Sequence, residues 1–320
     1  MDSQKEKITL IDHLNASLLM LVTPEYKSLR ATRTDNGYLE IPTFETPNPM
    51  PLSHVVVKNT RIRYAYSPSV NKPSLVMLSP FPQSIVAYAA IWPILDQHFN
   101  LYAFDMPGFG HSEGGVEFMT FIAQGEFLKL LIDHFKINDP HIVGPDVGMP
   151  AALYCASNYP DSIKSLLVGD GPAISPSSNA SSLRKMVNSR FWRTVFRLTG
   201  SGALLAAANK IGYTNYCPNH DEVADYISAY RTRMSAAMSW FRDYNINIET
   251  VDPLLKSIAT PTLVFWGEQD AILELTNGER IVERMPNAEM LVFKNTGHFC
   301  YQDRYVEFSA MVVSWVRAND

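Results

Sequence analysis

Short apolar runs, each leading into a helix-forming stretch, recur along most of this 320-residue chain, and this alternation constrains its fold more than any other feature. Strands are predicted at 73–79, 100–105, 141–146, 162–170, 260–270 and 288–298, and helices at about 84–98, 116–135 and 149–158. A hairpin over residues 54–67, turning near Asn59, is predicted before them. Parallel strands need crossover connections, so the repeated strand-then-helix order predicts an α/β fold whose doubly wound, mostly parallel sheet is covered on both faces.

The alternation is interrupted once, between two predicted strands. Residues 171–252 are helical in character and rich in aromatic side chains, with stretches such as FWRTVF and MSWFRDY. We therefore expect them to form an inserted helical lid, because a segment without strands cannot extend the sheet. The α/β core then consists of residues 51–170 and 253–320.

Residues 1–50 do not follow the pattern of the rest of the chain and form an N-terminal extension. The apolar residues Leu10, Ile11, Leu14, Leu18 and Leu21 recur at helical spacing and predict a short amphipathic helix. We expect this helix to pack on the body of the protein, although it could also cover the active site or contact a second subunit in a homodimer. The prolines that follow predict an irregular lead-in, and they are Pro42, Pro47, Pro49 and Pro51.

The sequence Gly144-Pro145-Asp146-Val147-Gly148 lies between a predicted buried strand and a predicted helix. A nucleophile elbow has this G-x-nucleophile-x-G pattern in this strand–turn–helix context. Its glycines are needed because the turn is tight and neighbouring strands crowd it. Asp146 is thereby predicted at the carboxyl end of the sheet, where open α/β folds bind ligands. An ordinary turn with a helix-capping aspartate is the alternative.

Two further residues follow in the order of a catalytic triad. Asp270 ends one predicted strand, and His298 follows the last one. Nucleophile, acid and histidine in this order, each at the carboxyl end of a strand, favour a shared catalytic function over chance. Asp170 also ends a strand and is the alternative acid. We expect Asp270 to orient the histidine.

On these residues the chain resembles the α/β-hydrolase superfamily over residues 52–318, with an aspartate where serine is usual. Within it, an aspartate nucleophile is similar to the branch of epoxide hydrolases and haloalkane dehalogenases. FDMPGFGHSEG (104–114) is similar to the loop that follows the fourth strand in that branch. SPFPQS (79–84) takes the place of its HGxP motif, with Ser79 and Pro80 as departures. The resemblance implies an oxyanion hole formed by the backbone N–H groups of Phe81 and Val147, neither of which is proline.

An aspartate nucleophile restricts the possible chemistry. Its carboxyl group is ordinarily ionised at neutral pH and needs no base to activate it. Attack on an ester carbonyl is unproductive, because the carboxylate would leave in preference to an alkoxide. Attack on saturated carbon succeeds on a strained epoxide or against a halide, and forms an ester at Asp146. His298, oriented by Asp270, would then activate the water that hydrolyses this ester.

Opening of an epoxide releases an alkoxide and so needs a proton donor, which the resemblance assigns to a tyrosine of the lid. MSWFR (238–242) resembles the motif that carries this tyrosine, but Phe241 stands in its place beside Trp240. The lid phenols that could replace it are Tyr213, Tyr216, Tyr226, Tyr230 and Tyr244, of which Tyr216 and Tyr230 are our first choices. GPDVG also resembles hydrolases of microbial secondary metabolism, so an epoxide on an apolar, polyketide-like molecule is the leading expectation.

Two other functions stay open. A haloalkane or haloacid dehalogenase needs N–H donors for the halide; Val147 replaces the usual Trp or Arg, but Trp192 lies about where those enzymes carry a halide-binding pair. A non-hydrolytic cyclase or ligand-binding protein of this fold is favoured by the altered SPFP loop and the missing lid tyrosine. An intact set of Asp146, Asp270 and His298 argues against it.

Composition gives no sign of several classes of partner and location. The chain has a formal net charge of −5 and no basic tract, which gives no reason to expect nucleic acid or an anionic membrane as a partner. It has no apolar run of about 20 residues for a membrane span and no pattern of a signal peptide, so a cytoplasmic protein with a small apolar substrate is expected. Three scattered cysteines form no disulfide framework. No HExxH, Walker or GxGxxG pattern occurs, so no metal or cofactor is expected.

Overall fold

The computed structural model of the protein describes residues 6–20, 42–44, 50–175 and 181–320. These residues contain an eight-stranded sheet of order β1-β2-β4-β3-β5-β6-β7-β8. The strands β1 and β2 form the predicted antiparallel hairpin at one edge, and from β4 to β8 all neighbours are parallel. The strands are β1 (Leu52–Val57), β2 (Thr60–Ser67), β3 (Ser74–Leu78), β4 (Asn100–Phe104), β5 (His141–Pro145), β6 (Ser165–Gly169), β7 (Thr262–Gly267) and β8 (Ala288–Phe293).

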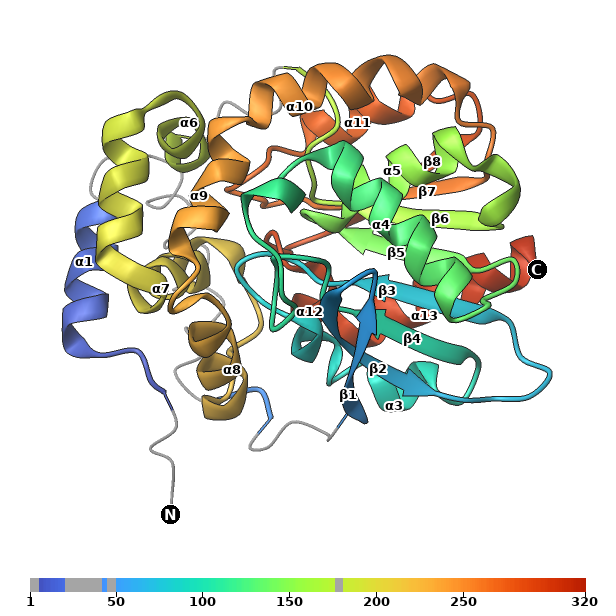
Figure 1. The fold of residues 1–320 in the computed structure, drawn as a ribbon, viewed down its shortest axis with the longest axis horizontal. Coiled ribbons are helices and arrows are strands. Elements are labelled where there is room, and N and C mark those ends of the chain that lie inside the picture. Colours follow the sequence, from blue (N-terminus) through green and yellow to red (C-terminus); the bar gives the residue numbers. More distant parts are fainter. Residues whose placement is uncertain (1–5, 21–41, 45–49, 176–180) are drawn as a thin grey trace.

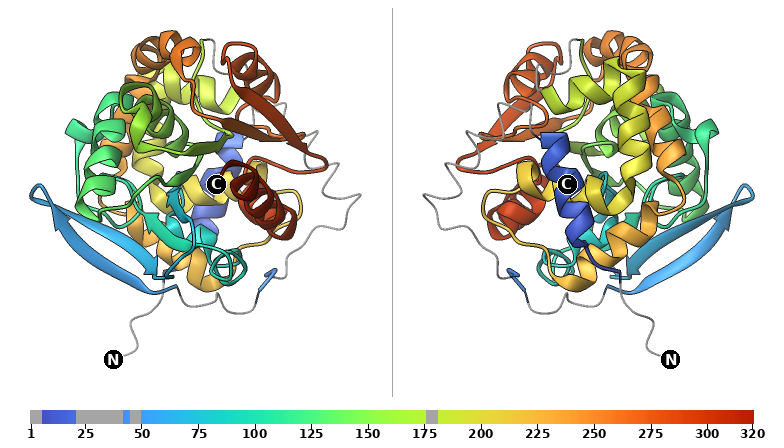
Figure 2. Two further views of the ribbon diagram at one scale, coloured as in Figure 1. Left: turned by 90° about the vertical axis from the view of Figure 1, so that its right-hand side faces the viewer. Right: turned by 90° about the vertical axis from the view of Figure 1, so that its left-hand side faces the viewer.

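The parallel strands are apolar on both faces because each face carries its own core. In β3, Val76 and Leu78 join one hydrophobic cluster, whereas Leu75 and Met77 join the other. Helices α4 and α5 cover the first face, and α3 and α13 cover the second (Figures 1 and 2). The helices of this core are α3 (Trp92–Leu95), α4 (Phe121–His134), α5 (Gly148–Asn158), α11 (Thr276–Val282), α12 (Cys300–Asp303) and α13 (Tyr305–Asn319). The structure thus has the α/β-hydrolase fold.

Two predicted helices are shorter than expected. The segment predicted as a helix over 84–98 contains a 3-10 turn, Ile85–Tyr88, and the single turn α3. Pro93 in the first turn of α3 has no N–H to continue a preceding helix, so it marks a new start. The helix expected from residue 116 begins at Phe121, where Thr120 accepts a hydrogen bond from the Ala123 N–H at 3.1 Å and caps it. A separate 3-10 turn, Val116–Phe118, precedes it.

Between β6 and β7 the described residues contain helices and no strand. These are α6 (Ser181–Asn188), α7 (Arg190–Gly212), α8 (His220–Tyr230), α9 (Met234–Arg242) and α10 (Tyr244–Val251), and we refer to residues 171–252 as the insertion. Helix α7 is broken at Gly200, whose φ of 84° is open to glycine but strained for other residues. Across the described ranges no helix is both long and apolar enough to span a bilayer.

The N-terminal helix α1 (Leu10–Met20) packs on α7 of the insertion, at the left of Figure 1. The side chains that it buries are Ala16, Leu19 and Met20. The stripe predicted to pack inward is instead exposed over Leu10, Ile11, Leu14 and Leu18. Packing is set by the glycine in α7: a Cβ at Gly202 would lie 2.7 Å from the Asp12 carboxyl, so the two helices meet along the Asp12 side of α1. Leu21, Pro47 and Pro49 lie outside the described residues.

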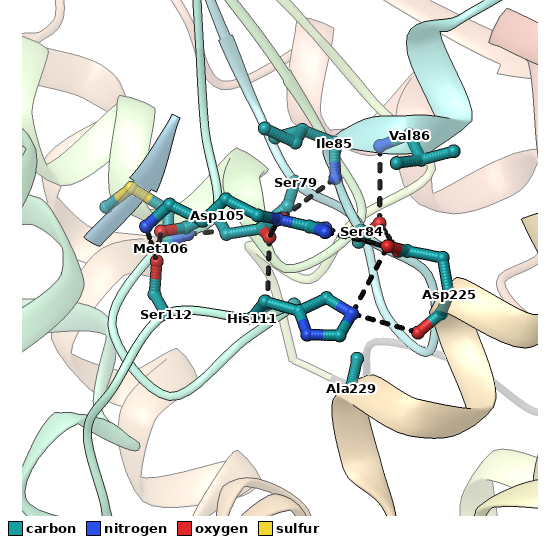
Figure 3. A network of polar contacts seen from close by, with 12 residues as sticks. Ser79, Ser84, Ile85, Val86, Asp105, Met106, His111, Ser112, Asp225 and Ala229 are labelled. Carbon is teal, nitrogen blue, oxygen red and sulfur yellow. Dashed lines mark hydrogen bonds and ion pairs between the residues drawn. The ribbon is translucent and has the colours of Figure 1, made fainter. Parts of the chain in front are cut away.

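A buried polar network fixes α8 to the core (Figure 3). Arg63 of β2 donates to Asp105 at 2.5 Å and to Asp225 of α8 at 2.7 Å. His111 lies between the two carboxylates: its backbone N–H donates to Asp105, and its ring Nε2 is 3.2 Å from Asp225 Oδ2. Burial favours the neutral carboxyl, but the hydrogen bonds from His111 and Arg63 hold the pKa of Asp225 well below its usual range. An ionised pair therefore anchors one end of the insertion.

Candidate active site

Asp146 lies on a sharp turn between β5 and α5. Its φ is +49°, a left-handed conformation that is strained for a residue with a side chain. Both flanking glycines are required by close contacts. A Cβ at Gly148 would lie 2.8 Å from the Leu78 Cβ, and one at Gly144 would lie 2.9 Å from the Gly148 carbonyl oxygen. The turn that the GPDVG pattern predicts is thus present, with Asp146 at its apex.

Three side chains predicted from separate parts of the sequence meet at the carboxyl end of the sheet. His298 Nε2 lies 3.2 Å from Asp146 Oδ2, and His298 Nδ1 lies 2.8 Å from Asp270 Oδ2. The other oxygen of Asp270 accepts hydrogen bonds from the backbone N–H groups of Ile272 and Leu273, at 2.8 and 2.9 Å. Asp270 is therefore held in one orientation, and it holds the imidazole in turn.

The two carboxylates control the charge of His298. Burial alone would lower the pKa of this fully buried imidazole, but the charges of Asp270 and Asp146 and their hydrogen bonds raise it well above its usual value. While both carboxylates are charged, this favours the protonated imidazole. Any reaction that removes the charge of Asp146 would lower the pKa of His298 and turn it into a base.

Asp170, the alternative acid, lies at the end of β6 and does not contact His298 by a hydrogen bond among the described residues. Its Oδ1 accepts from the Gly267 N–H at 3.3 Å. Complete burial and the nearby charge of Asp270 raise its pKa well above the ordinary value, which favours its neutral form. The missing hydrogen bond to His298 and this shift distinguish Asp170 from Asp270.

The predicted backbone donors flank Asp146. The Phe81 N–H donates to Asp146 Oδ1 at 2.9 Å. The Val147 N–H makes no hydrogen bond with any residue that the structure describes, and Val147 lines the cavity in front of Asp146. The departures Ser79 and Pro80 do not disturb this arrangement, because Ser79 points back to accept from the Met106 N–H at 3.2 Å. An oxyanion at the Asp146 carboxyl can thus receive at least one preorganised N–H.

A narrow apolar cavity opens onto Asp146 and His298. The space that the centre of a water-sized sphere can occupy in this cavity has a volume of about 70 Å³. Two hydroxyl-bearing side chains also line the described wall of this cavity, Ser182 of α6 and Tyr244 of α10. The remaining wall is mostly aliphatic and aromatic and includes Met20 of α1. The ligand that fits is therefore largely apolar.

The lid residues predicted to meet the substrate divide into two groups. Trp240 and Phe241 line the cavity. Tyr216, Tyr230 and Trp192 are not among the described residues that line it. The Tyr216 hydroxyl donates to Glu222 at 2.7 Å, in a buried cluster away from the cavity. The Tyr230 hydroxyl donates to the Gln83 carbonyl at 3.0 Å and accepts from the Gly110 N–H at 2.9 Å.

The third of these, Trp192, contacts Phe191 and lies under the Lys185 ammonium, 5.2 Å from its ring centre. Among the five lid tyrosines named from the sequence, Tyr244 lines the cavity. Ser182 is buried, and its hydroxyl has no hydrogen-bond partner within the described residues. Neither Ser182 nor Met20 lies in a recognisable motif, so the sequence held no signal for their place in the wall.

Comparisons with known proteins agree with this architecture. The family described as alpha/beta hydrolase fold matches residues 73–305. An uncharacterized hydrolase of Saccharomyces cerevisiae is 24% identical over 293 residues, which cover 82% of this chain and 96% of that protein. A putative lipase from Acinetobacter baumannii has a TM-score of 0.73 at 19% identity, over 92% of this chain and 96% of the other. Haloalkane dehalogenase DbeA from Bradyrhizobium elkani has a TM-score of 0.72 at 18% identity, over 84% and 98%.

Proposed function

The chain belongs to the alpha/beta hydrolase family, and within this family we propose that it hydrolyses an epoxide carried by an apolar molecule, through an ester formed at Asp146. The observation that supports this most is the contact of His298 with both Asp146 and Asp270, at 3.2 and 2.8 Å. An aspartate on the elbow that faces a cavity is suited to attack saturated carbon rather than a carbonyl.

In the first step a carboxylate oxygen of Asp146 attacks one epoxide carbon. The new C–O bond forms as the ring C–O bond breaks, and the ring oxygen takes the hydroxyl proton of Tyr244. The attack consumes the negative charge of Asp146, so the pKa of His298 falls and its proton returns through solvent to the Tyr244 oxygen. The protein then holds a neutral ester, a neutral imidazole and a neutral phenol.

In the second step His298 removes a proton from water, and the hydroxide attacks the ester carbonyl of Asp146. The Phe81 and Val147 N–H groups stabilise the resulting oxyanion. The tetrahedral intermediate expels the diol oxygen, which takes the proton held by His298. Asp146 is left as a carboxylic acid, and transfer of its proton to His298 restores the ion pair of the free protein.

A single-turnover reaction in heavy-oxygen water tests this pathway. Because water attacks the carbonyl carbon of Asp146, the first turnover should place ¹⁸O in the peptide that contains Asp146 and leave the diol unlabelled. Label in the diol with none in the protein would mean that water attacks the epoxide directly, and the covalent pathway would be lost. An apolar, polyketide-like epoxide is the substrate class to try first.

A dehalogenase is the second candidate. The Trp240 indole lines the cavity, and no hydrogen bond joins its N–H to another described residue, which leaves a donor for a leaving halide. This reaction uses the same Asp146 ester but needs no proton from Tyr244. Halide release from short haloalkanes, unaffected by Tyr244→Phe, would favour it over the epoxide.

A further inference from the structure

The outer face of α1 is apolar and is exposed in the part of the chain that the structure describes. Leu10, Ile11, Leu14 and Leu18 are 76%, 69%, 62% and 56% exposed, whereas the opposite side of the same helix is buried against α7. Four large aliphatic side chains in successive turns of one helix form a continuous strip rather than isolated exposed residues. The strip needs an apolar neighbour to leave water.

The first half of α7 is also exposed and has a different composition, and its arginines line a surface hollow shared with α9. Phe191 and Leu198 are 69% and 75% exposed, and they alternate with the exposed Arg190 and Arg197. Positions 190, 191, 197 and 198 are separated by two helical turns, so the four side chains share one side of the helix. Large apolar and cationic residues on one exposed helix face are typical of helices that lie in a lipid–water interface.

The two faces are neighbours and lie over the cavity. Helices α1 and α7 pack together and form the left edge of the molecule in Figure 1, which is turned toward the viewer in the right-hand view of Figure 2. Their inner sides reach the cavity, because Met20 of α1 and Phe196 of α7 line it. A molecule held at the outer surface is thus one helix thickness from the Asp146 site.

The charge of this surface distinguishes among occupants. No carboxylate of the described residues pairs with Arg190, Arg197 or the exposed Arg184 of α6. The chain as a whole carries −5, yet Arg190 and Arg197 lie beside Arg193 and, across a surface hollow, Arg242 of α9. Two copies placed face to face would bring these arginines together, whereas an anionic surface neutralises them.

We propose that this α1–α7 face docks on an anionic lipid surface, with the α1 leucines, Phe191 and Leu198 inserted among the lipid chains and the arginines at the headgroups. Docking would orient the molecule so that the cavity lies close to the lipid, where an apolar substrate is concentrated. Overall composition does not reveal such a surface, because the net negative charge averages over the acidic remainder of the chain.

Flotation with vesicles tests the proposal on the full chain. We expect the protein to float with vesicles of equal phosphatidylcholine and phosphatidylglycerol, and to float less with phosphatidylcholine alone or in 0.5 M salt, since salt screens the arginines. Leu14→Glu with Leu18→Glu should abolish flotation. Arg190→Glu with Arg197→Glu should reduce binding to the anionic vesicles at least tenfold, because each cation near an anionic surface contributes roughly a fivefold factor.

The control pair is Val70→Glu with Lys58→Glu, which places the same kinds of change on exposed residues outside the α1–α7 face. The control should float like the unaltered protein, and thermal unfolding should show that every variant is folded. Failure of the unaltered protein to float, or equal loss in the control pair, would overturn the proposal. So would a lipid-free dimer that Leu14→Glu with Leu18→Glu converts to a monomer, because the face would then bind a second copy. Activity on a dissolved epoxide, unchanged in these variants, keeps this test separate from the proposed reaction.

Discussion

The carboxyl edge of the sheet and the insertion above it are built on opposite principles. At the sheet edge, the oxygens of Asp146 and Asp270 have defined hydrogen-bond partners at 2.8 to 3.2 Å. In the wall that the insertion contributes, contacts are mostly apolar, and Ser182 has no partner within the described residues. The hydrogen-bonded carboxylates hold the reacting groups in place, whereas the apolar wall determines which substrates can bind. Changes at the sheet edge should therefore affect rate most, and changes in the insertion should affect binding and stability.

The sharpest test of the sheet edge compares its two carboxyl groups. Asp270→Asn removes the anion that stabilises the His298 imidazolium, and we expect the rate to fall about 10³-fold or more. Asp170→Asn replaces a carboxyl that bonds to the Gly267 N–H rather than to His298 and whose raised pKa favours the neutral form, so the rate should change less than about tenfold. Steady-state kinetics on one epoxide measures both. The reverse order of effects would identify Asp170 as the orienting acid.

Tyr244→Phe tests whether the insertion also takes part in the chemistry. Loss of a proton donor should slow ester formation about 10²-fold in single-turnover experiments. Tyr216→Phe is the matched control, because its hydroxyl bonds to Glu222 away from the cavity, and its rate should be unchanged. Adding Phe241→Tyr to Tyr244→Phe should recover part of the rate, since both residues line the same cavity. Equal loss in the two phenylalanine variants would refute the assignment.

Asp225→Asn tests how the insertion is attached to the core. It leaves the buried Arg63 with one carboxylate in place of two, so the free energy of unfolding should drop by about 3 kcal/mol. Asp243→Asn, which breaks an ion pair of the half-exposed Arg242 in the same insertion, should cost less than about 0.5 kcal/mol. Urea unfolding measures the difference. Equal effects would show that the network of Figure 3 does not anchor α8.

Glu222 of α8 gives the smallest predicted effect, as a dependence of stability on pH. Burial raises its pKa to about 7, against the opposing hydrogen bonds from Asn219, Tyr216 and Gln302. Between its ordinary pKa and 7 the folded state binds the proton more tightly than the unfolded state, so stability falls as pH rises and levels off above 7. The advantage of the natural chain over Glu222→Gln should therefore shrink by about 2 kcal/mol from pH 5 to pH 8. A constant difference across that range would contradict the shift.

The contrast between the two regions also explains what could be predicted from the sequence. The strands and the turn at Asp146 follow from local patterns: short apolar runs in the strands, and glycines where a Cβ would collide with Leu78 or with backbone. Asp270 and His298 could be found because strand ends of a parallel sheet meet at one edge. The patterns of the strands and the turn involve only residues close together in the sequence, and the meeting of the strand ends follows from the topology of the sheet.

No comparable local pattern in the sequence determines which residues line the cavity or which face of α1 packs on α7. Which tyrosine of the insertion reaches the cavity depends on how five helices pack, and Tyr216 and Tyr230 bond elsewhere although Tyr244 lines it. The leucine pattern of α1 correctly predicts a helix but gives the wrong face, because the close approach at Gly202 decides the contact. The spacing of apolar residues identifies the apolar side of a helix but does not show which element packs against it.

Trapping the covalent intermediate tests the central claim most directly. In His298→Gln the carboxylate can still attack carbon, but no base activates water, so the ester at Asp146 should accumulate. Intact mass after incubation with an epoxide that the natural chain turns over should increase by the mass of one substrate, and peptide mapping should place the increase on Asp146. The double variant with Asp146→Ala should show none. If His298→Gln stays at its original mass with every epoxide and haloalkane that the natural chain consumes, Asp146 does not bond to the substrate.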